Sequence, residues 1–244
     1  MAGEGSRFAK AGYPNPKPFI PIDGQPMIRW VMENLRYPGA HYVLIMRQEH
    51  ADREQQFVAE LAARPDVSIH FLDALTEGTA CTVAAAEHLI PNDRPMLIAN
   101  SDQLVSGGIE AMIDDAIERD LGGSIMVFPD EGDPKWSFAR LNSENLVVEV
   151  AEKKPISKLA TVGIYHFGRA GEFFNGVRKM IASDDRVNNE FYTCPVYNYL
   201  IADGTRIGTY LIQPTDMWGL GTPADFESAL ANPMFRETFA SGVS

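Results

Sequence analysis

Apolar runs alternate with amphipathic segments along the first half of this chain, and that alternation constrains its fold more than any other feature. Four runs are apolar enough to form buried strands: 41–47, 67–72, 96–100 and 124–128. Between them stand three segments with apolar residues at the spacing of one helix face: 51–63, 80–89 and 109–119. Strands that alternate with helices indicate parallel crossover connections. The sequence therefore predicts an α/β fold with a doubly wound, mostly parallel sheet.

The pattern changes after residue 130. Three strand-like segments follow one another closely: 137–141, 146–152 and 160–167. Later elements are expected as two helices, a strand and a last helix: about 170–182, about 191–202, 206–212 and from Pro223 onward. Strands that follow one another without a helix between them are typical of antiparallel pairing. We therefore expect a small antiparallel portion in the C-terminal half.

A loop of small residues opens the chain and leads directly into a cation. The loop residues and the cation are Ala2, Gly3, Gly5, Ser6 and Arg7. Glycines let backbone N–H groups approach a phosphate closely, because no Cβ stands in the way. An arginine can bind phosphate oxygens through two parallel hydrogen bonds. Lys17 adds a second positive charge between two prolines, so the chemistry is that of a nucleoside triphosphate site.

The full string is more specific than a lone Gly-x-Gly. Gly3-Glu-Gly-Ser-Arg-Phe is followed by Pro16-Lys-Pro-Phe-Ile-Pro and then by Gly24-Gln-Pro-Met-Ile. It resembles the signature of the sugar-phosphate nucleotidyltransferase family, which includes glucose-1-phosphate thymidylyltransferases and related cytidylyltransferases for phosphocholine-type substrates. Further matches to the family pattern cover nearly the whole chain: 76–80, 100–103, 152–167, 189–199 and 218–226.

The resemblance implies one domain over residues 1–244, with a nucleotide-binding part over about 1–130 and an acceptor-binding part over about 131–244. It implies transfer of a nucleotidyl group from a nucleoside triphosphate to a sugar-1-phosphate or similar phosphorylated acceptor, with release of pyrophosphate. Arg7 and Lys17 would be the catalytic cations that stabilise the phosphates. In the family a buried strand precedes the glycine loop, so we expect that first strand to be missing before Met1.

An aspartate at the end of a strand is the expected magnesium ligand. Asp102 matches the family's metal-binding aspartate, although a simple turn built by Asn100-Ser101-Asp102 is the structural alternative. Mg²⁺ often takes only one or two protein carboxylates, with phosphates and water as its other ligands. Many family members place a second aspartate two residues before the glycine of Gly-Thr-Pro. Gly219 stands there in this chain, and Asp216 is the expected replacement.

Gly78 and Thr79 match a segment that borders the nucleotide in the family. Gly78 would let a ring approach closely, and Thr79 would cap the helix that follows. A plain helix N-cap is the alternative for this segment, and the two interpretations are compatible.

The resemblance also implies three acceptor-binding residues, Lys153, Gly163 and Glu190. Lys153, preferred over Lys154, would contact the acceptor phosphate, and Gly163 would leave room for the sugar or its replacement. Glu190 would bind acceptor hydroxyls. The structural alternatives are a solvated turn for the lysine pair and an acidic first turn of a helix for Glu190.

Composition limits the partners. A net charge of −12 argues against a general nucleic-acid surface, which needs a basic stripe. The sequence shows no apolar run of membrane-spanning length and no signal peptide, so a cytoplasmic protein is expected, with a homo-oligomer left open. Two other functions compete with the enzyme. One is a non-catalytic regulatory protein that binds nucleotide-sugars, and the other is a glycosyltransferase of similar fold, whose Asp-x-Asp metal motif is absent at residues 100–102.

Overall fold

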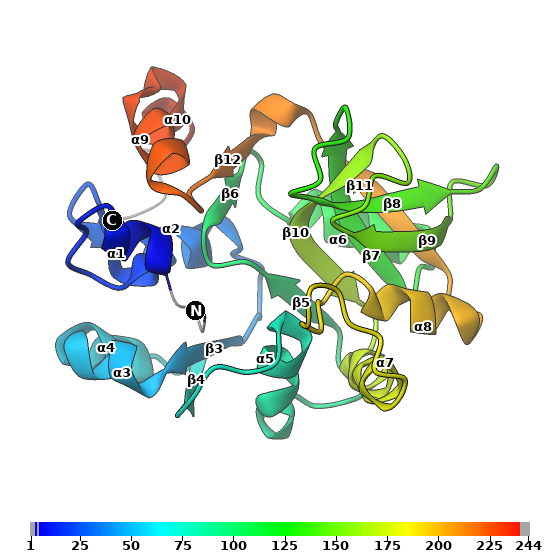
Figure 1. Ribbon diagram of the computed structural model, residues 1–244, viewed down its shortest axis with the longest axis horizontal. Coiled ribbons are helices and arrows are strands. Elements are labelled where there is room, and N and C mark those ends of the chain that lie inside the picture. Colours follow the sequence, from blue (N-terminus) through cyan, green and yellow to red (C-terminus); the bar gives the residue numbers. More distant parts are fainter. Residues whose placement is uncertain (1–2, 4, 240–244) are drawn as a thin grey trace. The chain divides into compact units, whose positions relative to one another are not determined.

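The computed structural model describes Gly3 and residues 5–239 (Figure 1). Its contacts divide the chain into two compact units. Unit 1 comprises Met1–Leu75, Asn100–Ile109 and Thr215–Ser244, and unit 2 comprises Thr76–Ala99 and Glu110–Pro214. Each unit is built from segments that are distant in sequence. The division therefore differs from two successive parts that meet near residue 130.

Within its described residues, unit 1 contains three two-stranded sheets. Their strands are β1 (Pro21–Ile22), β2 (Gln25–Pro26), β3 (Tyr42–Arg47), β4 (Val67–Leu72), β6 (Gln103–Val105) and β12 (Met217–Gly219). β3 and β4 pair in parallel, as expected for strands joined through helices. β6 and β12 are antiparallel, with Leu104 opposite Trp218. This short ladder joins the segment that carries Asp102 to the C-terminal part of the chain.

The helices of unit 1 contribute to one apolar core with β3, β6 and β12. They are α1 (Ser6–Lys10), α2 (Met27–Asn34), α3 (Gln48–Arg53), α4 (Gln55–Ala62), α9 (Pro223–Ala231) and α10 (Pro233–Phe239). The single helix predicted over 51–63 is divided, because the backbone of Glu54 (φ −124°, ψ 39°) leaves the helical region between α3 and α4. The predicted start at Pro223 is confirmed. Thr222 accepts the backbone N–H of Asp225 at 3.1 Å and so caps α9.

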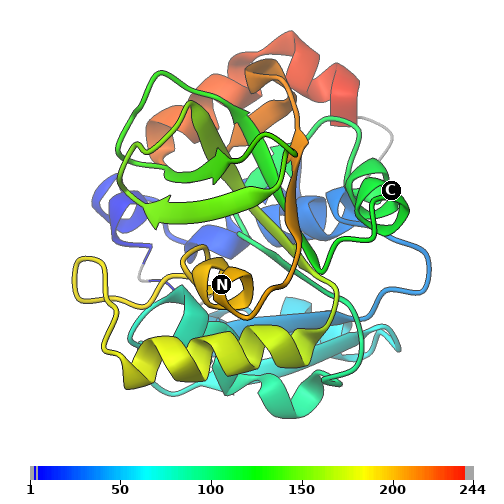
Figure 2. The ribbon, with the colours of Figure 1, turned by 90° about the vertical axis from the view of Figure 1, so that its right-hand side faces the viewer.

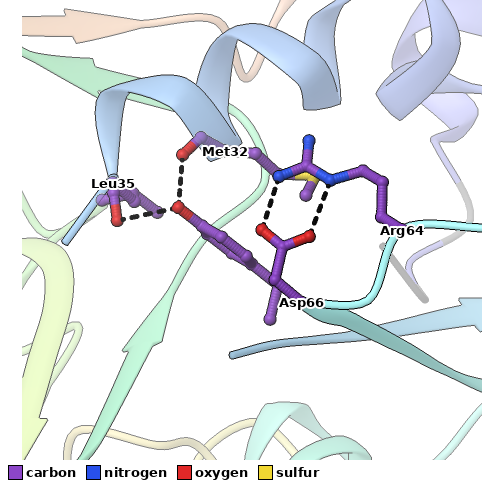
Figure 3. A network of polar contacts seen from close by, with 5 residues as sticks. Met32, Leu35, Arg64 and Asp66 are labelled. Atoms are coloured by element: carbon purple, nitrogen blue, oxygen red, sulfur yellow. Dashed lines mark hydrogen bonds and ion pairs between the residues drawn. The ribbon is translucent and has the colours of Figure 1, made fainter. Parts of the chain in front are cut away.

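A polar network fixes the end of α2 to the parallel pair β3–β4 (Figure 3). The Tyr42 hydroxyl donates to the Met32 carbonyl at 3.1 Å and lies 3.5 Å from the Leu35 carbonyl. The last carbonyl groups of a helix have no partner within the helix, so the tyrosine satisfies groups that would otherwise need water. Arg64 binds both carboxylate oxygens of Asp66, at 3.0 and 2.7 Å. The Asp66 carbonyl in turn accepts the Tyr42 N–H at 2.8 Å.

Unit 2 is built on a six-stranded sheet. Its strands are β5 (Met96–Ala99), β7 (Gly123–Pro129), β8 (Ser137–Leu141), β9 (Val147–Glu152), β10 (Leu159–Phe167) and β11 (Ile207–Leu211). The order is β11-β7-β10-β8-β9, and β5 also pairs with β10. Only β11 and β7 are parallel among the described pairs of this sheet.

The predicted α/β class is confirmed, and the sheet is mixed. The antiparallel share is larger than expected from the sequence. β5, which the sequence assigns to the parallel part, runs antiparallel to β10, with Ile164 opposite Ala99. Its helical neighbours in sequence suggested a parallel crossover, but the partner strand lies much further along the chain.

Helices cover both faces of this sheet. α7 (Ala170–Ala182) and α8 (Val196–Ala202) pack against each other, as Figure 2 shows in yellow and gold. Their apolar side chains share a core with Ile125, Phe167 and Ile207. Gly208 follows Ile207 in β11, so it faces the other side of the sheet. There it meets Leu121, which follows α6 (Glu110–Glu118). α5 (Thr79–Ala85) also contributes to the core shared by α7 and α8. The helix predicted from residue 191 is α8, and it begins later, at Val196.

No helix within residues 5–239 is both long and apolar enough to cross a membrane.

Candidate functional site

The predicted phosphate loop lies in unit 1 and leads into α1. Gly5 adopts a left-handed backbone (φ +61°) immediately before the helix, and a Cβ there would lie 3.5 Å from the Lys17 Cβ. Gly3 has open space around it, while Ala2 lies outside the described residues. Ser6 and Arg7 are exposed. The structure thus brings the glycine loop close to the second predicted cation.

Arg7 presents its guanidinium to solvent. It makes no hydrogen bond or ion pair with any residue that the structure describes. The helix is anchored instead through the buried Phe8, whose ring packs edge-on against Tyr13 and Phe226 at 5.1 and 6.0 Å. The backbone at Arg7 is therefore held in place while its five N–H donors stay available for a ligand.

Lys17 and Asp102 are in direct contact in unit 1. The ammonium group donates to the Asp102 carboxylate, and the two side chains retain 23% and 19% of their exposure. Asp102 is held from the other side, because its carbonyl accepts the Leu220 N–H at 2.8 Å. A Cβ added at Gly221 would lie 3.1 Å from Asp102 Oδ2, so only glycine leaves this carboxylate uncrowded. A predicted catalytic cation and the predicted metal ligand therefore form one pair.

The structure does not bring Asp216 to this pair. The carbonyl of Asp216 accepts the Ser106 N–H at 2.8 Å, whereas Asp102 is bonded to Leu220 four residues further along the chain. At about 3.3 Å per residue, the two positions are roughly 13 Å apart along the ladder. This separation of the two backbone positions favours Asp102 over Asp216 as the protein ligand. In addition, no cluster of three or more His, Cys, Asp or Glu side chains suited to a metal occurs among the described residues.

Gly78 and Thr79 stand at the start of α5 in unit 2. Gly78 has φ +130°, and a Cβ there would lie 2.4 Å from the Phe191 carbonyl oxygen. The glycine is thus required by the close passage of residues 190–193, whatever ligand it borders. The predicted cap is wrong, because Gly78 is the N-cap and Thr79 is the first helical residue. The Thr79 hydroxyl instead accepts the Thr193 N–H at 3.0 Å.

The two predicted acceptor residues Lys153 and Glu190 are joined through a tyrosine. Lys153 Nζ donates to the Tyr192 hydroxyl at 2.6 Å, and that hydroxyl donates to the Glu190 carboxylate. The ammonium also lies 4.5 Å from the centre of the Tyr192 ring, a cation–π distance. Lys154, by contrast, is exposed. The network supports the preference for Lys153.

Glu190 does not begin a helix, so the first-turn alternative is wrong. It pairs with Val187 in an isolated bridge, and α8 begins only at Val196. Sequence reasoning missed Tyr192. Its position two residues after Glu190 is visible in the sequence, but the expected helix over 191–202 would have turned the two side chains away from each other.

A second carboxylate lies next to Lys153. Glu152 accepts a hydrogen bond from the Ser137 hydroxyl. Burial raises the pKa of this carboxyl group, while the Ser137 hydrogen bond and Lys153 act to lower it.

Gly163 lies in the middle of β10 with φ +91°, where the register of β10 against β7 shifts between Thr161 and Tyr165. The β-bulge accounts for glycine at this position.

Comparison with known proteins gives the family. The profile of the nucleotidyl transferase family matches residues 1–210, and the chain belongs to that family. Its fold is similar to that of a nucleoside-diphosphate-sugar pyrophosphorylase from Vibrio cholerae RC9, with a TM-score of 0.83 and 28% identity over 95% of this chain and 98% of that one. The resemblance seen in the sequence is therefore confirmed.

Two further relatives are more distant. The low-salt glycan biosynthesis nucleotidyltransferase Agl11 of Haloferax volcanii is 20% identical over 214 residues, which are 86% of this chain and 58% of Agl11. The chain thus spans little more than half the length of this relative. The inositol-1-phosphate CTP transferase of T. maritima shares the fold, with a TM-score of 0.70 and 16% identity over 100% of this chain and 95% of that one.

Proposed function

We propose that the chain transfers a nucleotidyl group from a nucleoside triphosphate to a sugar-1-phosphate or similar phosphorylated acceptor. An acceptor phosphate oxygen attacks the α-phosphorus, the bond from that phosphorus to the bridging oxygen of the β-phosphate breaks, and pyrophosphate leaves. The attacking oxygen is already anionic, so no general base is needed. Positioning and charge stabilisation are then the main tasks of the protein.

The exposed guanidinium of Arg7 is the observation that carries this proposal. It follows a glycine loop of the family signature, its backbone is anchored by Phe8, and it has no partner among the described residues. Such a group can bind triphosphate oxygens and stabilise the negative charge on the leaving pyrophosphate. Lys17 supplies a second cation beside Asp102. Lys153 supplies a third, for the acceptor phosphate.

A divalent metal is typical of this family, and the residues fit a magnesium ion held by one protein carboxylate. Asp102 would hold it, with phosphates and water as the other ligands. When bound, the ion neutralises charge on the reacting phosphates. Lys17, which contacts the same carboxylate, would supply a positive charge to the phosphates as well. Asp216 is not part of this proposal, because the ladder holds it away from Asp102.

A pyrophosphate-release assay tests the function. The purified chain is incubated with each common nucleoside triphosphate and a panel of acceptors that includes hexose 1-phosphates and phosphocholine. We expect pyrophosphate only when one matching triphosphate and one matching acceptor are both present. Tight binding of an added nucleotide-sugar without any pyrophosphate release would instead favour a regulatory protein. Release of a nucleoside diphosphate from the added nucleotide-sugar would favour a glycosyltransferase.

A further inference from the structure

Tyr192 is the centre of a polar network in unit 2. Its hydroxyl accepts a hydrogen bond from Lys153 and donates one to Glu190. Burial and the neighbouring Glu190 raise the pKa of Tyr192, so the phenol keeps its proton at neutral pH. Because that proton is directed to Glu190, a lone pair of the same oxygen faces the ammonium of Lys153. Glu190 thus fixes the direction of the hydroxyl, and the hydroxyl fixes the direction of the lysine.

Lys153 differs from its neighbours in charge compensation. Lys135, Lys158 and Lys179 of the same unit pair with carboxylates at 3.0, 3.2 and 2.6 Å, and all three are largely exposed. Lys153 is less exposed than these and makes no ion pair within residues 5–239. A neutral hydroxyl and a ring face are its partners. A partly desolvated cation whose direct partners are neutral favours an anionic ligand.

The backbone on both sides of the network is fixed. Lys153 has φ +53°, which is uncommon for a residue other than glycine, and its N–H donates to the Trp136 carbonyl at 3.1 Å. On the other side, the Phe191 N–H donates to the Glu77 carbonyl at 2.8 Å, and the Phe191 ring lies 4.0 Å from the guanidinium of Arg186. The two side chains therefore meet between anchored segments and not between mobile loops.

We propose that Tyr192 is a positioning residue for the phosphate of the acceptor. Its hydroxyl engages one of the three ammonium protons of Lys153 and leaves the other two directed at a phosphate. This inference rests on the proposed function and names a determinant of the acceptor half of that site. It assigns to Tyr192 no contact with the nucleoside triphosphate and no role in proton transfer.

The test compares Tyr192→Phe with Tyr199→Phe. The first change removes the hydroxyl and keeps the ring under Lys153. The second removes a matched hydroxyl, which donates to Asp185 at 3.0 Å and meets no lysine. With the triphosphate and acceptor identified by pyrophosphate release, we expect Tyr192→Phe to lower kcat/KM for the acceptor about tenfold, as for a lost hydrogen bond to a charged group. The KM for the triphosphate should change less than twofold, and Tyr199→Phe should match the unmodified chain.

A binding measurement separates this inference from the function itself. Inorganic phosphate is titrated calorimetrically into the unmodified chain, Lys153→Met and Tyr192→Phe. The Lys153→Met variant identifies the phosphate binding that depends on Lys153. The affinity of that binding should fall about tenfold in Tyr192→Phe, whether or not the chain catalyses pyrophosphate release. Absence of pyrophosphate release overturns the proposed function alone. An unchanged titration in Tyr192→Phe, or no loss of binding in Lys153→Met, overturns the positioning role.

Discussion

The ammonium group of Lys17 lies directly on the carboxylate of Asp102, so the residue expected to bind phosphates and the residue expected to bind metal neutralise each other. The pair keeps about a fifth of its side-chain exposure, and it is reinforced by the backbone bond from Leu220 to Asp102. A divalent ion held by Asp102 would share this carboxylate with Lys17, so the pair would offer two positive charges to the phosphates.

The first prediction concerns the charge of Asp102. Asp102→Asn keeps the shape of the side chain and removes the charge, so magnesium-dependent pyrophosphate release should be abolished while the circular dichroism spectrum is retained. Asp216→Asn is the matched control, since it removes a carboxylate from a residue of the same ladder whose backbone lies roughly 13 Å away. The Mg²⁺ concentration for half-maximal rate should be unchanged in that control. Full activity of Asp102→Asn would place the metal elsewhere.

Arg7 should be essential for turnover. Loss of a donor to developing negative charge typically costs about 10²-fold or more in rate, and Arg7→Ala should lower kcat/KM for the triphosphate by at least that factor. Stability should hardly change, because the side chain is exposed and unpartnered among the described residues. Lys10→Ala removes one positive charge from the same short helix and should change the rate less than threefold. Near-normal kinetics of a folded Arg7→Ala protein would contradict the assignment.

A carboxylate placed at Gly219 should strengthen the metal site. Many members of the family carry a metal-binding aspartate at this position, and a Cβ at Gly219 meets no atom within 4 Å, so an aspartate would fit there without a clash. Gly219→Asp should lower the Mg²⁺ concentration for half-maximal rate on the order of tenfold, which corresponds to about 1.4 kcal/mol. Gly219→Asn is the isosteric control and should leave the metal titration unchanged. Equal titrations for the two variants would show that an ion at Asp102 does not reach residue 219.

Gly78 should tolerate no side chain. In Gly78→Ala the new methyl group would overlap the Phe191 backbone, and a shift of that segment should cost at least about 2 kcal/mol in the free energy of unfolding. Gly204→Ala is the control, since Gly204 also has positive φ (+87°) but open space around its Cα. Its cost should stay near about 1 kcal/mol, from backbone strain alone. Urea denaturation measures the free energy of unfolding of both variants. Equal losses in the two would show that the close approach of Gly78 to Phe191 contributes nothing to the cost.

His166 should make the fold sensitive to acid. Burial lowers the pKa of His166, and its buried Nδ1 has no hydrogen-bond partner among the described residues. Because the unfolded chain then binds the proton more tightly, stability should fall as the pH drops below about 6.5, the ordinary value for histidine. In His166→Leu the melting temperature should therefore decline less between pH 7.5 and 5.5. His88→Leu, which alters an exposed histidine of the same unit, should retain the full decline.

Local patterns predicted most element positions. The bounds of β4, β8 and α7 agree with the expected segments, and Thr222 caps α9 as its sequence indicates. Pairing between distant segments could not be predicted in this way. β5 runs antiparallel to β10, which lies more than sixty residues further along the chain, and nothing local to β5 indicates that partner.

The site shows the same limit. Family motifs pointed to Arg7, Asp102 and Lys153 because each follows a recognisable loop or strand end. The motifs could not show that Lys17 forms an ion pair with Asp102 or that the Thr79 hydroxyl accepts the Thr193 N–H. These contacts join residues 85 and 114 positions apart in the chain. Their roles in catalysis stay predictions.

The contacts around Phe191 have a consequence for substrate affinity. Its N–H bonds to Glu77, its carbonyl accepts the N–H of Ala80, and the next turn is bonded to Thr79. Hydrogen bonds therefore join the segment proposed for the nucleotide, 77–80, to the segment proposed for the acceptor, 190–193. A ligand that displaces one must carry the other with it or break these bonds. By thermodynamic linkage, occupancy of either proposed substrate subsite would then alter the affinity of the other by the same factor.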